Sequence, residues 1–90
     1  MEFRLSRYAR EQMERRGITE QHVALVVDGP SQIVAGHSGK RLHQSVVDFA
    51  DGRRMLLRVV VATGSDPPTI VTAYRTSHIE RYGGSDEDHL

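Results

Sequence analysis

The 90-residue sequence contains no cysteine and no tryptophan. The absence of cysteine excludes disulfides and thiolate metal sites, and is compatible with a reducing cytoplasm, where we expect the protein to act. No apolar run approaches the roughly 20 residues needed to cross a bilayer, and the first residues do not resemble a signal peptide. With 38% hydrophobic and 27% charged residues, the composition is that of one small globular domain rather than of a disordered chain.

The chain also lacks a net charge, but its charges are unevenly distributed. All twelve Lys and Arg precede Gly83-Gly84, whereas three of the twelve Asp and Glu follow it, so the preceding part carries +3. This mild excess is well below that of a dedicated nucleic-acid binder, and it permits an RNA substrate without pointing to one. We expect residues 1–82 to form a single domain and residues 83–90 to be a flexible acidic tail.

Capping residues predict two helices at the start of the chain. Ser6 can cap a helix that runs to about Arg16, where Gly17 provides a left-handed stop. Thr19 can cap a second helix that ends near Asp28. Two helices joined by so short a connection form a helical hairpin.

Beyond the helices the hydrophobic period changes to two, which predicts strands. Asp51-Gly52 predicts a two-residue hairpin loop, and the capping-box form of Ser77–Glu80 predicts a short helical turn that runs to Tyr82. We therefore expect an α+β fold with two helices on one face of a four-stranded antiparallel sheet. The expected strands are Gln32–Ala35, Arg41–Ala50, Arg53–Thr63 and a last one within Thr69–His78.

The two connections between the long strands predict which residues share a face. A two-residue Asp51-Gly52 loop places Ser45 opposite Arg58 and His43 opposite Val60, since directly opposed residues lie on one face. The expected helix-covered face then holds Leu42, Val46, Met55, Leu57, Val59, Val61, Val71 and Ala73. The expected polar face holds His43, Ser45, Arg54, Arg58, Thr72, Tyr74 and Thr76, with Val47, Leu56 and Val60 between them.

Three segments carry a resemblance to a known group of proteins. Met13–Thr19, Arg53–Val61 and Val71–Ser77 together resemble a small family of domains of unknown function that is grouped with the RelE- and BrnT-like toxins. The resemblance extends nearly to Tyr82. It implies a RelE-like fold and a bacterial toxin that acts as a metal-independent endoribonuclease and is neutralised by an antitoxin protein. Related sequences often carry histidine early in the first helix, where this chain has Tyr8.

An activity of that kind would place specific demands on the polar face. Metal-free RNA cleavage needs a base near the ribose 2′-hydroxyl, positive charge at the phosphate and an acid for the leaving oxygen. The expected catalytic residues are His43 and His78 as base or acid, Arg58 as phosphate ligand and Tyr74 as hydrogen-bond donor or stacking platform. The expected substrate-binding residues are Arg16, Arg41, Arg54 and Thr72.

Simpler interpretations remain open for each of these residues. A histidine on a half-exposed strand is often only a polar surface residue, and Arg58 opposite Tyr74 can be a stacking pair that covers the sheet. Arg16 can serve only the dipole of its helix, and Arg75 can extend past the core edge from the helix-covered face. No histidine has the spacing of a metal site, so we expect neither a metal nor a cofactor. The alternative to a ribonuclease is a non-catalytic protein-interaction or regulatory module that uses the same polar face.

Overall fold

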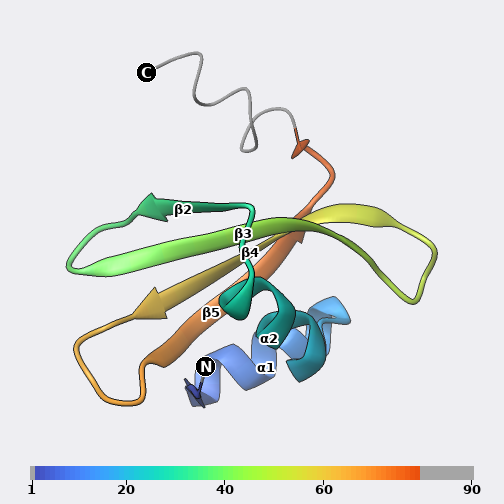
Figure 1. Cartoon of the computed structure of the whole chain (residues 1–90). Coiled ribbons are helices and arrows are strands. Elements are labelled where there is room, and N and C mark those ends of the chain that lie inside the picture. Colours follow the sequence, from blue (N-terminus) through green and yellow to red (C-terminus); the bar gives the residue numbers. More distant parts are fainter. Residues whose placement is uncertain (1, 80–90) are drawn as a thin grey trace.

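The computed structural model describes residues 2–79, and the expected tail 83–90 lies outside this range. Of the expected helical turn Ser77–Tyr82, only the first three residues lie inside it. The fold is α+β, with two helices and a five-stranded mixed sheet whose strand order is β1-β5-β4-β3-β2. Both helices lie on one side of the sheet (Figure 1). The elements are β1 (Arg4–Leu5), α1 (Arg7–Arg16), α2 (Glu20–Asp28), β2 (Gln32–Ala35), β3 (Lys40–Asp48), β4 (Arg54–Ala62) and β5 (Thr69–Thr76).

The helix boundaries confirm the capping predictions. The Ser6 hydroxyl accepts a hydrogen bond from the Ala9 amide at 3.0 Å, which satisfies one of the unpaired donors in the first turn of α1. Gly17 ends α1 in the left-handed region with φ of 66°, a conformation that glycine adopts without steric cost. At α2, Thr19 and His22 form a reciprocal capping box, with both bonds at 3.1 Å.

A fifth strand, β1, was not predicted and makes the sheet mixed rather than wholly antiparallel. Arg4 and Leu5 pair in parallel with Thr69 and Ile70, and the Ser6 amide donates to the Ile70 carbonyl at 3.0 Å. Two residues are too few to show an alternating pattern, so this strand has no periodic signal in the sequence. The sheet therefore starts at the N-terminal segment, directly before α1.

The hairpin between β3 and β4 corrects the predicted register. Its loop has three residues, Ala50–Gly52, because the Phe49 amide donates to the Arg53 carbonyl at 2.8 Å and the Gly52 amide to the Phe49 carbonyl at 3.0 Å. Gly52 occupies the left-handed position with φ of 83°, as expected for a three-residue hairpin loop that ends in a glycine bulge. The loop is one residue longer than the Asp51-Gly52 turn that the sequence suggested.

That one extra residue moves every side chain of β3 to the other face. Gln44, not Ser45, is opposite Arg58, and His43 is opposite Val59 rather than Val60. The prediction that His43 and Ser45 share a face with Arg58 is therefore wrong.

The register between β4 and β5 was predicted correctly except at its start. Tyr74 is opposite Arg58, as expected. Nearer the loop the pairing shifts, so that Val60 is opposite Thr72 whereas Val61 is opposite Ile70. This irregularity, a β-bulge, reverses the predicted positions of the first residues of β5, because Ile70 is fully buried in the core and Val71 is only half-buried.

The core lies between the helices and the adjacent face of the sheet. Leu57 and Val59 are fully buried in it, as predicted. Leu56 points to the opposite face and is nevertheless only 2% exposed, so burial is not confined to the helix-covered face. Among the described residues, no helix is long and apolar enough to span a membrane. The clustered core residues are Ala9, Met13, Ile18, Val23, Val26, Val27, Phe49, Leu57, Val59, Val61, Ile70 and Ala73.

Candidate functional site

The candidate site is the sheet face opposite α1 and α2, which we call the open face. Within residues 2–79, no helix packs on this face (Figure 1). The strand pairing gives its composition, which mixes apolar side chains with neutral polar ones around a single central arginine, Arg58. The central residues of the open face are Gln32, Val34, Leu42, Gln44, Val46, Leu56, Arg58, Val60, Thr72, Tyr74 and Thr76.

A continuous row of hydrogen-bonded side chains crosses the open face. The Gln44 amide nitrogen Nε2 donates to Gln32 Oε1 at 2.8 Å, and Arg58 Nε donates to Gln44 Oε1 at 2.8 Å. Arg58 Nη1 then donates to the Tyr74 hydroxyl at 2.8 Å, and its guanidinium lies 5.7 Å from the Tyr74 ring centroid. Each member comes from a different strand, so register alone brings them together. We call Gln32, Gln44, Arg58 and Tyr74 the recognition row.

Burial and hydrogen bonding hold the middle of the recognition row in one geometry. Gln44 is 1% exposed and Arg58 is 8% exposed. The buried guanidinium uses two of its nitrogens to organise Gln44 and Tyr74, which differs from a surface arginine that extends freely toward phosphate. Only the ends of the row, Gln32 and Tyr74, are partly exposed, and the buried Gln44 and Arg58 hold these two side chains in a fixed geometry, which lowers the entropy cost of binding.

His43 lies on the other side of the sheet, under the helices. It is 7% exposed, and its ring forms a hydrogen bond with the backbone of Val27 near the end of α2. Nδ1 of the same ring is buried without a partner among the described residues. Burial lowers the pKa of His43 below its usual 6.5, although the bond with Val27 opposes this shift and the nearby charge of Arg41 adds to it. The imidazole expected beside Arg58 is thus absent from the open face.

The lowered pKa of His43 predicts a loss of stability in mild acid. The His43 ring binds a proton less readily in the folded protein than in the unfolded chain. Its contribution to the free energy of unfolding is therefore complete above pH 6.5 and is lost as the pH falls through the pKa of the folded state. The slope attributable to this residue cannot exceed about 1.4 kcal/mol per pH unit. Urea unfolding between about pH 5 and pH 8 should show a steeper fall for the wild type than for His43→Gln. Parallel curves for the two proteins would contradict the assignment.

The remaining predicted residues are dispersed. Arg54 lies at the end of the open face and pairs with Asp48 at 3.4 Å, both side chains being largely exposed. Arg41 is exposed and shares the His43 side of β3. Arg16 donates from Nη1 to the Ala73 carbonyl at 2.8 Å, so its part in this structure is to cap the edge of β5.

Of the two other predicted residues, Thr72 lies beside the recognition row and His78 lies beyond the end of β5. Thr72 is half-buried on the open face, two residues before Tyr74 on the same strand. His78 is exposed just after β5, and its backbone amide donates to the Thr76 hydroxyl at 3.1 Å. Of the predicted catalytic residues, the structure therefore brings together Arg58 and Tyr74, with His78 beyond the end of the strand and His43 on the opposite face.

Sequence reasoning missed Gln32 and Gln44, the two amide members of the row. Glutamine does not titrate and carries no charge, so it has none of the properties that mark an acid, a base or a phosphate ligand in a sequence. The signal that could have found Gln44 is the hairpin register, since a three-residue loop ending at Gly52 places it opposite Arg58.

A second cluster of charged and aromatic side chains closes the loop end of the molecule on the helix side. Arg75 pairs with Asp51 at 2.8 Å and lies 4.4 Å from the centroid of the Phe49 ring, which in turn contacts the ring of His22 edge-on at 4.7 Å. The hydrogen bond from Arg75 holds the pKa of Asp51 below its usual value. The cluster fastens the hairpin loop to the helices, which agrees with the expectation that Arg75 extends past the core edge.

Comparison with known proteins gives one match. Residues 5–75 match the model of a family described as a domain of unknown function, DUF4258. No curated protein matches the sequence. No solved structure matches it either. In the described part of the chain, no group of three or more His, Asp or Glu side chains is arranged to hold a metal ion.

Proposed function

We propose that this chain, which belongs to the DUF4258 family of domains of unknown function, is a non-catalytic module that binds a protein partner through its open face. The observation that carries the proposal is the hydrogen-bonded recognition row, which crosses four strands and is flanked by apolar side chains. Interfaces of this kind combine an apolar centre with a few fixed polar groups, and Tyr and Arg are enriched among their strongest contributors.

The groups present on the open face favour binding over catalysis. Metal-free RNA cleavage requires a proton acceptor near neutral pH. His43 would be that group in the predicted site, but it lies beneath the helices with a lowered pKa. Arg58 is buried and engaged with Gln44 and Tyr74, so it contributes orientation rather than a mobile charge. What remains is a rigid surface with alternating apolar and hydrogen-bonding rows.

The charges at the margins of the open face indicate what the partner carries. Lys40 and Arg54 belong to the two ends of this face and Arg58 to its centre, whereas Asp48 is the acid that the strands of the described part, residues 2–79, place on it. Charge complementarity across an interface selects partners and speeds their encounter. The partner segment we infer has apolar side chains for the centre of the face and carboxylates for its margins.

The test is binding by matched variants. Thr72→Arg would place a bulky charge beside Tyr74, and Tyr8→Lys changes a 54% exposed residue on the helix side as a control. The wild type and Tyr8→Lys should capture the same protein from the source cells, and calorimetry with that purified protein should show about tenfold or greater weakening for Thr72→Arg. Equal affinity of Thr72→Arg and the wild type would contradict the proposal.

A second candidate function is the ribonuclease toxin of a RelE-like toxin–antitoxin pair, acting in the cytoplasm. The specific observation in its favour is His78, which follows the strand that carries Tyr74. Its imidazole is exposed, and its backbone amide donates to the Thr76 hydroxyl at the end of that strand. In this alternative the protein partner is the antitoxin, and His78 takes the acid–base role. RNA cleavage that persists in EDTA and is lost in His78→Ala would favour this function over the first, whereas RNA left intact by the wild-type protein would exclude it.

A further inference from the structure

The outer edge of β3 is only half paired in the described structure. β3 has nine residues, but β2 pairs only with its first part, Arg41–Gln44. Pro30 precedes the start of β2 and has no amide hydrogen, so the ladder cannot continue along the chain in that direction. Ser31 still contacts β3, because its amide donates to the Gln44 carbonyl at 3.0 Å and its amide and hydroxyl lie 2.7 and 2.8 Å from Ser45 Oγ, but the strand pairing itself begins at Gln32.

The unpaired part of this edge presents backbone donors and acceptors. The amide of Phe49 points toward β4, where it donates to Arg53. Because backbone groups of successive residues alternate in direction, those of Val46 and Asp48 point away from β4. Within residues 2–79, no strand lies beside them. An edge of this kind is a template for one more strand.

A hollow runs along this edge and is walled on its other side by α2. It has a volume of about 550 Å³, and its lining includes the β3 segment Ser45–Asp48 together with Leu25 and Gly29. Leu25 is 65% exposed, the highest value among the large apolar side chains of the described residues. A neighbouring hollow of about 750 Å³ continues over α2 past Ala24 and Asp28. We call this combined surface the α2–β3 groove.

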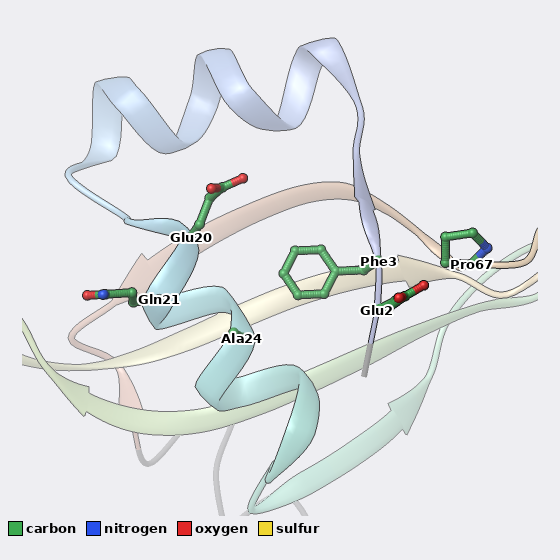
Figure 2. A pocket seen from close by; sticks show the side chains of 6 residues that line it. All are labelled: Glu2, Phe3, Glu20, Gln21, Ala24 and Pro67. Atoms are coloured by element: carbon green, nitrogen blue, oxygen red, sulfur yellow. The ribbon is translucent and has the colours of Figure 1, made fainter.

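The surroundings of the groove are acidic, although the described part of the protein is not. Residues 2–79 contain eleven Lys and Arg against eight Asp and Glu. A third hollow at the other end of α2 adds Glu2 and Glu20, and Figure 2 shows the Phe3 ring reaching toward α2 between them. Among residues 2–79, the charged side chains that line the three hollows are Glu2, Glu20, Asp28 and Asp48, with no Lys or Arg. Arg54, the exposed ion-pair partner of Asp48, does not line them.

We propose that the α2–β3 groove binds an extended, basic segment of another protein, which adds to β3 as a strand alongside Val46–Asp48. The unpaired backbone groups provide the ladder, and Leu25 provides an apolar contact for a side chain that the added strand directs toward α2. The acids around α2 attract the lysines or arginines of the segment. A second copy of this chain is a poorer occupant across a two-fold axis, because that axis would place the same acidic surface against itself. This surface is separate from the recognition row.

The experiment uses a short fluorescent peptide that alternates valine and lysine, with two controls. One control peptide replaces lysine by glutamate. The other carries N-methyl groups on alternate backbone amides, so that the edge of the peptide that would pair with β3 has no hydrogen-bond donors. The wild-type protein should bind the first peptide at least tenfold more tightly than either control, with amide chemical shifts concentrated in α2 and β3. Equal binding of all three peptides would overturn the proposal.

Matched variants locate the site. Leu25→Lys and Tyr8→Lys each replace an exposed apolar side chain, so both should fold. Leu25→Lys should weaken binding of the valine–lysine peptide about tenfold or more, whereas Tyr8→Lys should not. Binding lost in Thr72→Arg but kept in Leu25→Lys would assign the peptide to the open face and overturn the inference. Self-association of the wild type that Leu25→Lys abolishes would give the groove to a second copy, with the same consequence.

Discussion

Leu57→Ala is expected to lower the free energy of unfolding by about 2–5 kcal/mol, the usual cost of truncating a buried leucine and leaving a cavity. Leu57 has no exposed surface and lies at the centre of the sheet face that both helices cover. Leu25→Ala is the matched control, since its side chain is mostly exposed and its truncation should change stability by less than about 0.5 kcal/mol. Urea denaturation of the three proteins measures both effects. A loss below about 0.5 kcal/mol for Leu57→Ala would mean that the core face is assigned wrongly.

Arg58→Ala is expected to destabilise the fold as well as to impair binding. Its removal takes the donors away from Gln44 Oε1 and from the Tyr74 hydroxyl, and an unsatisfied buried polar group costs about 1–3 kcal/mol. Tyr74→Phe removes only one acceptor at the end of the row, so its cost should be smaller, about 0.5–1.5 kcal/mol.

A double-mutant cycle separates the row from its individual members. If Arg58 and Gln44 act as one network, the losses for Arg58→Ala and Gln44→Ala should be non-additive by about 0.5–3 kcal/mol. Strict additivity, together with an unchanged stability of Arg58→Ala, would show that the guanidinium is not tied into the row. Urea denaturation at one pH is sufficient for all four proteins of the cycle.

Sequence predicted those parts of the fold that are determined by residues close together in the chain. Ser6, Thr19 and Gly17 set the ends of the helices through groups that act within a few residues. The strand positions followed from the period of two. β1 escaped notice because its two residues are ordered by pairing with β5, a contact between segments far apart in the chain.

Sequence predicted two of the four residues of the recognition row, Arg58 and Tyr74. Gln44 was missed because of a single extra loop residue. The β4–β5 pairing brought Arg58 and Tyr74 together as expected. The β3–β4 pairing differs from the predicted one by one residue. Asp51-Gly52 is compatible with a two-residue or a three-residue loop, and sequence alone does not distinguish the two. A change of one residue exchanges the two faces of β3, so His43 was placed in the site and Gln44 was left out of it.

The recognition row depends on the β3–β4 register, which places Gln44 rather than His43 beside Arg58. The most direct measurement of this register is the set of cross-strand proton contacts made by His43 and Gln44 in solution. We expect contacts between the Gln44 and Arg58 side chains on the open face, and between the His43 ring and Val59 and Val27 on the helix side. Contacts of the His43 ring with Val60 and Thr72 would instead place an imidazole beside Tyr74. That result would contradict the recognition row and restore the case for catalysis on the open face.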